Sequence, residues 1–202
     1  MKTFTTVTVG YSYNELSESA KEKAKQWYLN NETRNNIFYD DIMLYLHDNF
    51  KSSELNVMYS LGYCQGDGLN IYGNLNLYDF LDMWQASPKE KRTIEFYIDR
   101  AVYQYTFVKD NRYCYSCKFI DKKHIDDTVE EFITELQDNK ITNIKKPLIS
   151  QFFNDMIDYF ESLDAEFEYN GYNYLYNCDD EEIEEACEAN EWYFTESGDF
   201  IK

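Results

Sequence analysis

Residues 55–77 read LNVMYSLGYCQGDGLNIYGNLNL, and this stretch decides the fold class. On each side of Gln65-Gly66-Asp67-Gly68 the residues alternate with a period of two, which is typical of a β-strand. Glycine admits the positive φ that a tight turn needs, and an aspartate in the turn accepts hydrogen bonds from backbone amides. The stretch therefore predicts two strands joined by a turn, as part of an antiparallel sheet.

Helical patterns lie on both sides of this stretch. Ser17 is predicted to cap a helix whose apolar face carries Ala20, Ala24, Trp27 and Tyr28. A second helix is expected over residues 37–50, where Phe38, Ile42, Leu46 and Phe50 recur at helical spacing. Further helices are expected over residues 125–139, capped by Asp126 or Asp127, through residues 152–163, and over the acidic residues 179–191.

Other segments favour strands. Residues 2–11, 93–108 and 112–120 are strand-like, and hairpins are expected over 165–177, turning at Asn170-Gly171, and over 192–202, turning at Ser197-Gly198. The predicted class is α+β, an antiparallel β-sheet with helices packed against it. We expect residues 1–202 to form a single domain; the alternative is a subdivision into residues 1–124 and a strongly acidic part, residues 125–202.

The charge of the chain is high and unevenly placed. There are 38 acidic and 19 basic side chains, a net charge of −19, and residues 148–202 hold 16 of the acids against the single base Lys202, a net of −15. Direct nucleic-acid binding is not expected, because phosphate contacts need Lys and Arg. A basic partner protein is the expected complement. No apolar run approaches the roughly 18 residues of a membrane span; together with an N-terminus that lacks a secretory pattern, this predicts a cytoplasmic protein.

The glycine-rich turn does not have the pattern of a phosphate or calcium site. A Walker loop ends in Gly-Lys-Ser/Thr and leads into a helix, whereas here no lysine follows and the continuation is strand-like. A calcium loop needs acids at alternating positions and a late glutamate. We interpret the stretch as a structural turn, with Gln65 and Asp67 as secondary candidates for contact with a partner.

The cysteines and histidines give no clear catalytic or metal site. Five cysteines without an export signal are expected to stay reduced. Cys114-Tyr-Ser-Cys117 is a CxxC, but zinc sites usually need a second such pair or a histidine pair; Cys178 and Cys187 could complete four ligands, and their spacing does not argue for it. We therefore expect no metal, no cofactor and no catalytic residue.

The acidic C-terminal quarter is the strongest functional candidate. Its acids alternate with tyrosines, which are enriched in protein interfaces because the ring adds contact area and the hydroxyl a hydrogen bond. Solvated acidic faces remain the alternative interpretation. The candidate partner-binding residues are Asp155, Asp158, Glu161, Asp164, Tyr169, Tyr172, Tyr174, Asp179, Asp180, Glu181, Glu182, Glu184, Glu185 and Glu188.

Three motifs resemble a family of small phage and prophage proteins. They are ELSESAKEKA (residues 15–24), YSLGYCQGDGLNIYG (59–73) and EEACEANEWYFTESGDFI (184–201), in the order that the family shows. The family pairs an ELSxxAKxKA helix with a strand–QGDG–strand element and closes with an acidic helix and a short hairpin.

This resemblance implies a phage protein that acts in the host cytoplasm. By analogy with acidic phage proteins, it implies an anti-defence inhibitor of the anti-CRISPR type, which mimics the charge of DNA and blocks a basic surface of a host CRISPR or restriction nuclease. Two alternatives remain open: an antitoxin-like or other accessory protein that binds a small basic partner, and a small enzyme of unknown chemistry.

Overall fold

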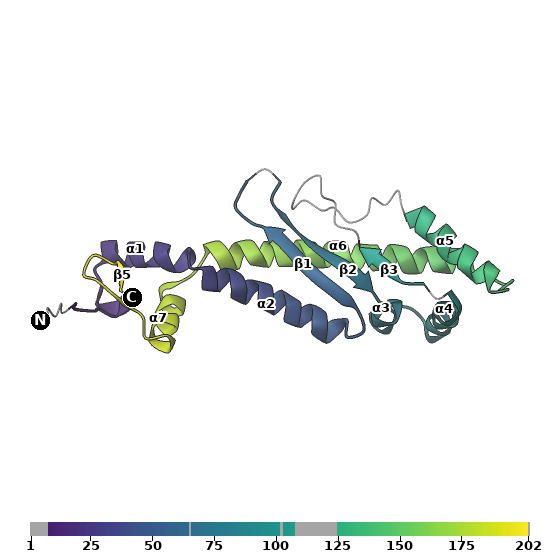
Figure 1. The fold of residues 1–202 in the computed structure, drawn as a ribbon, viewed down its shortest axis with the longest axis horizontal. Coiled ribbons are helices and arrows are strands. Elements are labelled where there is room, and N and C mark those ends of the chain that lie inside the picture. The colour runs from purple at the N-terminus through teal and green to yellow at the C-terminus, as the bar shows by residue number, and fades with distance from the viewer. Residues whose placement is uncertain (1–7, 65, 102, 108–124, 202) are drawn as a thin grey trace, which may run out of the picture. The chain divides into compact units, whose positions relative to one another are not determined.

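The described part of the chain holds seven α-helices, one 3₁₀ turn and two antiparallel sheets (Figure 1). The class is therefore α+β, as the sequence predicts. This computed structural model describes residues 8–64, 66–101, 103–107 and 125–201. The chain divides into two compact units: a terminal unit, Met1–Phe38 with Tyr172–Lys202, and a central unit, Tyr39–Gly171. The expectation of one domain, or of a division at residues 124/125, stays a prediction.

The central unit is built around a three-stranded sheet of order β1-β2-β3. Strands β1 and β2 pair antiparallel from Glu54↔Asn74 to Ser60↔Gly68, so the hairpin predicted over residues 55–77 is confirmed. Strand β3 adds to the far edge of β2, from Gly73↔Phe107 to Leu75↔Tyr105. The bounds of the elements are α2 Glu32–Asn49, β1 Glu54–Ser60, β2 Gly68–Leu75, α3 Leu77–Met83, α4 Pro88–Ala101, β3 Tyr105–Phe107, α5 Ile125–Asp138 and α6 Lys146–Tyr176, with α2 and α6 contributing residues to both units.

Aromatic side chains of α6 form the core under the sheet. The ring of Phe160 lies 4.6 Å from that of Phe107 on β3 and 5.0 Å from that of Phe50, which follows α2. The ring of Phe153, two turns earlier on the same helix, lies 6.0 Å from that of Tyr105. All of these rings but Phe50 belong to β3 or α6, so α6 is the element that covers the sheet.

The strand predicted over residues 93–108 is confirmed only in part. Residues 93–101 belong to helix α4, contrary to the prediction, Tyr105–Phe107 form strand β3, and residues 102 and 108 lie outside the described residues. The buried side chains Ile94, Tyr97, Ile98 and Ala101 have the i, i+3, i+4, i+7 spacing of a helix face. The β-branched and aromatic content of the segment favoured a strand, but packing of this face decided for a helix.

The hairpin predicted at Asn170-Gly171 is also wrong. Helix α6 continues through residues 165–177 as far as Tyr176. Gly171 is buried and its φ is not positive, so it serves as a small residue within the helix and not as a turn. Asn-Gly is a strong turn signal only when both flanks are strands, and here the flanks are helical.

The terminal unit packs α1 (Glu18–Leu29), the 3₁₀ turn η1 (Tyr13–Glu15), α7 (Asp180–Ala189) and the hairpin of β4 (Tyr193–Phe194) and β5 (Phe200–Ile201). The predicted Ser17 cap is confirmed, since its hydroxyl accepts a hydrogen bond from Ala20 N at 3.4 Å. The predicted turn at Ser197-Gly198 is also confirmed. Of the strand expected over residues 2–11, residues 1–7 lie outside the described residues and Tyr11 makes one bridge to Phe194.

None of the described helices is long and apolar enough to cross a membrane.

Candidate protein-interaction surface

Helix α7 begins where the sequence predicts an acidic helix. Asp179 caps it, because its Oδ1 accepts a hydrogen bond from Glu182 N at 2.8 Å. The acids of the first turn lie at the positive end of the helix dipole, which favours them there. Ile183 and Cys187, one turn apart, are the buried side chains that hold the helix in the terminal unit.

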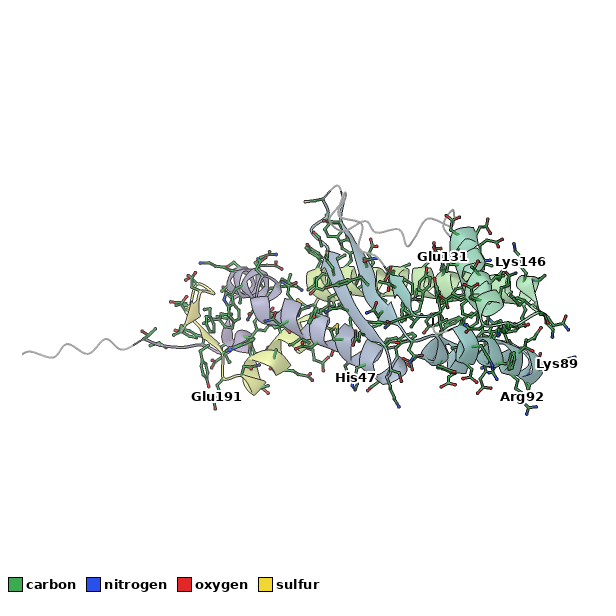
Figure 2. All side chains as sticks on the ribbon, turned by 45° about the vertical axis from the view of Figure 1, so that its right-hand side comes forward. His47, Lys89, Arg92, Glu131, Lys146 and Glu191 are labelled. Carbon is green, nitrogen blue, oxygen red and sulfur yellow. The ribbon has the colours of Figure 1, made fainter. Side chains whose placement is uncertain are left out.

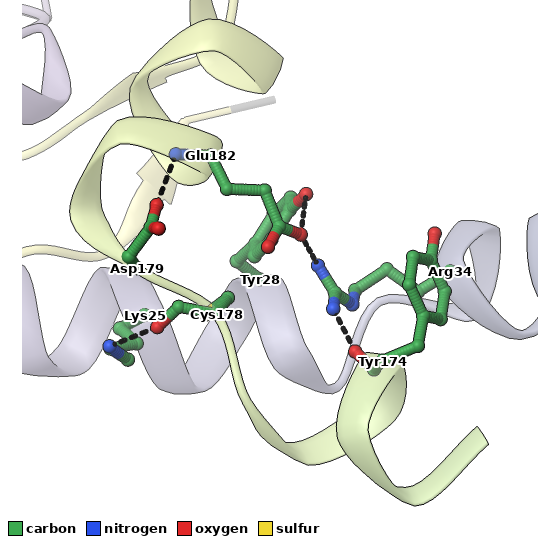
Figure 3. A network of polar contacts seen from close by, with 7 residues as sticks. All are labelled: Lys25, Tyr28, Arg34, Tyr174, Cys178, Asp179 and Glu182. Carbon is green, nitrogen blue, oxygen red and sulfur yellow. Dashed lines mark hydrogen bonds and ion pairs between the residues drawn. The ribbon is translucent and has the colours of Figure 1, made fainter. Parts of the chain in front are cut away.

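A buried arginine is bound to the start of α7 (Figure 3). The Arg34 side chain is 3% exposed, and its Nη1 donates to Glu182 Oε1 at 2.6 Å. Its Nη2 donates to the backbone oxygen of Tyr174 near the end of α6, where helix carbonyls lack an intrahelical partner. The guanidinium also lies 4.5 Å from the ring centres of both Tyr28 and Tyr174. Arg34 thus ties α2, α6 and α7 together within the terminal unit.

The environment of Arg34 keeps it charged despite burial. Burial alone would lower its pKa, but the hydrogen bond to Glu182 and the nearby Tyr28 and Tyr174 raise the pKa above its ordinary value. Tyr28 OH also donates to Glu182 Oε1 at 3.2 Å, and burial raises the pKa of Tyr28 to about 12. Glu182 therefore accepts two internal hydrogen bonds at one oxygen.

Some of the predicted partner-binding acids have structural roles. Besides Glu182 and the cap Asp179, Asp180 Oδ1 accepts a hydrogen bond from Tyr13 OH at 3.0 Å. Burial, followed by this bond to Asp180, raises the pKa of Tyr13. These contacts explain why the acids lie at the start of α7, and a further role in binding a partner stays a prediction for them.

Three acids of α7 form an exposed row along the helix. Glu181, Glu185 and Glu188 are exposed, at i, i+4 and i+7. Seven acids occupy residues 179–188, which at 1.5 Å per residue is roughly one negative charge per 2 Å of helix axis. Double-stranded DNA carries one per about 1.7 Å. The charge density along α7 is thus close to that of DNA.

A small cavity with acidic and aromatic walls lies beside this helix. It has a volume of about 240 Å³ and is lined by Tyr13, Glu184, Glu188, Glu191, Trp192 and Tyr193, among others. Glu184 and Glu188 lie one turn apart on α7, and Glu191 lies just past its end, so three acidic residues line the same cavity. The cavity is smaller than the roughly 300–1,000 Å³ of a cofactor pocket, so it suits a single side chain.

Glu191 reaches the cavity from an unusual backbone conformation. Its φ is 55°, in the left-handed region, just past the end of α7. Trp192 N donates to Cys187 O at 2.9 Å and Glu191 N to Glu188 O at 3.3 Å, the two hydrogen bonds of a Schellman motif. Glycine is the favoured residue at this position, so the glutamate is held there against its backbone preference.

The predicted acids of α6 belong to the central unit, whereas those of α7 belong to the terminal unit. Asp155 is half-buried and accepts a hydrogen bond from Trp84 Nε1 at 2.8 Å. Asp158 is exposed and Glu161 is half-buried. Asp155 therefore has a packing role, and a role of Asp158 and Glu161 in binding a partner stays a prediction.

Asp164 does not belong to an acidic surface, and this part of the prediction is wrong. It is 7% exposed, and its Oδ1 accepts a hydrogen bond from Ile71 N on β2 at 3.1 Å. Burial raises the pKa of Asp164 to about 9; the hydrogen bond from Ile71 lowers it, and the charges of Glu168 and Glu161 add to the rise. The side chain is a hydrogen-bond acceptor for the sheet and carries a proton at neutral pH.

The three predicted tyrosines differ in their surroundings. Tyr169, in the central unit, is 69% exposed. Tyr172 and Tyr174 are half-buried in the terminal unit, where Tyr172 stacks on Tyr176 at 6.2 Å and Tyr174 on Phe38 at 6.0 Å. Tyr174 is thus a packing residue around Arg34, whereas Tyr169 is accessible to a partner.

The turn after β1 is structural, as interpreted from the sequence. Asp67 accepts hydrogen bonds from Ser60 Oγ at 2.8 Å and Cys64 N at 2.6 Å, and Gly66 has a φ of 95°. The described residues do not include Gln65, Cys114 or Cys117. Within residues 8–64, 66–101, 103–107 and 125–201, no group of three or more His, Cys, Asp or Glu side chains is placed to hold a metal ion.

Sequence reasoning did not find Arg34 and Glu191. Arg34 is the only Lys or Arg between Lys25 and Lys51, and this isolation was the available signal of a structural role. Glu191 carried no signal, because its importance comes from where the helix ends. Comparisons with family models, with curated proteins and with solved structures found no match for this chain.

Proposed function

We propose that the terminal unit binds a basic surface of a partner protein, and that the cavity beside α7 accepts one Lys or Arg side chain of that partner. The observation that carries the proposal is that Glu184, Glu188 and Glu191 line one cavity together with aromatic residues. Carboxylates offer charge-assisted hydrogen bonds to a cation, and aromatic rings add cation–π attraction. A cation that enters a pocket of this kind is a typical interface hot spot.

The partner is, in this proposal, a nuclease of the phage host: a CRISPR effector or a restriction enzyme. Two features support it. The charge density along α7 is close to that of DNA, so the helix suits a groove that normally holds nucleic acid. The resemblance of residues 15–24, 59–73 and 184–201 to phage proteins supplies the host context. The mechanism is steric and electrostatic, with no bond chemistry, and it operates in the host cytoplasm.

The cation site is tested with an arginine-rich peptide as the probe. We expect the full chain to bind the peptide in isothermal titration calorimetry, and the triple variant E184Q/E188Q/E191Q to bind it about 10- to 100-fold more weakly, since each tenfold step is about 1.4 kcal/mol. The matched control is D126N/E131Q/E135Q on α5, three exposed acids of the central unit with the same change in net charge. Equal loss in both triple variants would show a general field effect and contradict the site.

The nuclease assignment needs its own measurement. We expect the full chain to inhibit DNA cleavage by a purified host CRISPR or restriction nuclease, with inhibition that weakens steeply between 50 and 200 mM salt. The α7 triple variant should lose inhibition while the α5 control keeps it. Peptide binding without inhibition of either class of nuclease would leave a basic-partner protein and refute the nuclease assignment.

A further inference from the structure

A cavity of the central unit has the opposite charge character to the rest of the chain. It has a volume of about 860 Å³ and lies between α4 and the segment that joins α5 to α6. Its described lining includes the cations Lys89, Arg92 and Lys140 and no carboxylate. Residues 39–171 hold 24 acids and 13 bases, a net of −11. A lining with three cations and no acid is therefore unexpected from the composition of this unit.

The cations come from two elements that are fixed against each other. Lys89 and Arg92 lie one turn apart on α4 and are exposed, as Figure 2 shows. The nearest acid of that turn, Glu90, faces the cap instead: its Oε2 accepts hydrogen bonds from Ser87 N at 2.9 Å and Ser87 Oγ at 2.5 Å. The carboxylate of Glu90 is therefore bound to Ser87 and does not pair with Lys89 or Arg92.

Tyr97 fixes the opposite wall. It is 3% exposed, and its hydroxyl donates to Asn143 O at 2.9 Å and accepts from Lys145 N at 3.0 Å. Both hydrogen-bonding roles of the hydroxyl are used to hold the α5–α6 segment against α4. The cavity wall is therefore held in place before any ligand binds, which lowers the entropic cost of binding.

Lys140 enters the cavity lining from a strained position. Its φ is 64°, and Lys140 N and Ile141 N donate to Gln137 O at 2.8 Å and Leu136 O at 3.0 Å, which is a Schellman motif at the end of α5. Glycine is favoured at this position, so a lysine there is a backbone outlier. An outlier of this kind at a cavity points to a role in binding.

The apolar part of the lining is aromatic. Phe96 is 42% exposed and lines the cavity with Ile141, and the guanidinium of Arg100 lies 4.3 Å from its ring centre. An aromatic ring in a cavity wall offers a ligand apolar contact area. Beside three cations, the ring suits a flat apolar body that carries a negative group.

We propose that this cavity binds a small organic anion with a flat, apolar body and a carboxylate, sulfonate or phosphate group. A long polyanion would meet the net charge of the whole unit, whereas a small anion meets mainly the cations within a screening length of about 8 Å. The volume lies in the range of about 300–1,000 Å³ for small-molecule sites. This inference does not depend on the proposed function, because the cavity lies in the central unit.

The test uses the full chain and 1-anilinonaphthalene-8-sulfonate as the probe. We expect one equivalent to bind with enhanced fluorescence, and the neutral analogue without the sulfonate to bind at least about 10-fold more weakly. The variant K140G should weaken the sulfonate about 10-fold, and its melting temperature should stay equal or rise, because glycine fits the left-handed position. F96A should also weaken binding, and K51A, an exposed lysine of the same unit, should not.

Three results would overturn the proposal. The first is equal affinity for the charged and neutral probes, which would show a purely apolar site. The second is unchanged binding in both K140G and F96A, which would place the probe elsewhere. The third is a single-stranded DNA oligonucleotide that binds more tightly than the sulfonate and competes with it, since this would assign the cavity to nucleic acid.

Discussion

Replacing Asp164 by asparagine should stabilise the protein at neutral pH and remove a specific pH dependence. Asparagine has nearly the same shape and keeps an oxygen that can accept the hydrogen bond from Ile71 N. It cannot ionise. The variant therefore resembles the protonated form of Asp164, which is the form that burial favours.

The magnitude follows from the two pKa values. In the folded chain the pKa of Asp164 is about 9, whereas an unfolded aspartate has a pKa of about 3.9. The folded state therefore holds the proton more tightly, and the stability that this gives is fully present below pH about 4 and is lost as the pH rises to about 9. The loss is about 1.4 kcal/mol per pH unit, so at pH 7 it amounts to about 4 kcal/mol, taken as an upper bound.

The assay is urea unfolding from pH 4.5 to 9.5, followed by circular dichroism, for the wild type and D164N. We expect the difference in unfolding free energy, variant minus wild type, to be smallest at pH 4.5, about 1 kcal/mol, and to rise with pH until about pH 9. Subtracting the two curves removes the other carboxylates, which titrate alike in both chains. The control is E166Q, an exposed acid of the same helix with the same charge change, which should stay within about 0.5 kcal/mol of the wild type.

Hydrogen exchange gives a second measurement at the contact itself. The Ile71 amide should be protected in both the wild type and D164N, because its acceptor is retained. A difference curve that is flat from pH 5 to 9 would refute the reasoning, since it would mean that Asp164 is ionised and solvated in the folded state. So would a D164N variant that is less stable than the wild type at every pH.

Two further substitutions test the terminal unit. R34M should lower the unfolding free energy by about 1.5–3 kcal/mol, because it removes charged hydrogen bonds to Glu182 and Tyr174 while Glu182 is exposed enough to regain water. Chemical unfolding measures this loss, and E182Q should lower the unfolding free energy by less. A larger loss in E182Q than in R34M would contradict the assignment of Arg34 as the buried partner. G198A should lower the unfolding free energy by about 1–3 kcal/mol, because Gly198 has a φ of 83° and an added Cβ would meet the backbone oxygen of Ala20. A melting temperature equal to that of the wild type would contradict this, since it would show that the hairpin is free to move away from α1.

The parts of the fold that local chemistry controls were predictable from the sequence. The 55–77 hairpin, the Ser17 cap, the Ser197-Gly198 turn and the Phe38, Ile42, Leu46, Phe50 face each depend on residues close together in the chain, and each is observed. Residues 93–101 and 165–176 are helical where the sequence predicts strands, because both segments are rich in aromatic residues that suit either structure. Contacts of each helix come from residues distant in the chain: Tyr97 donates to Asn143 O, and Tyr174 stacks on Phe38. The deciding information is therefore not local.

The candidate site divides in the same way. The acidity of residues 179–188 is plain in the sequence, but which acids are used internally depends on Tyr13 and Arg34, more than 140 residues away. The burial of Asp164 was likewise invisible, because it is set by β2 and not by the acids that surround it in the chain. A count of charges therefore predicts an acidic part of the molecule and overstates how much of it is available to a partner.

The two cavities share one local feature, a charged residue in the left-handed conformation just past the end of a helix. Helices α5 and α7 both end in a Schellman motif, and in both the left-handed position holds a charged residue, Lys140 with φ 64° and Glu191 with φ 55°. Glycine at either position would relieve strain of order 1 kcal/mol. Lys140 lines the cavity whose described lining has only cations among its charged residues, and Glu191 lines the cavity with three carboxylates. If the two charges served only solubility, any exposed position without strain would do as well. Their placement at cavity walls of matching sign is explained if each cavity binds a ligand of the opposite charge, and the strained backbone is then the cost of placing a charged residue in that wall.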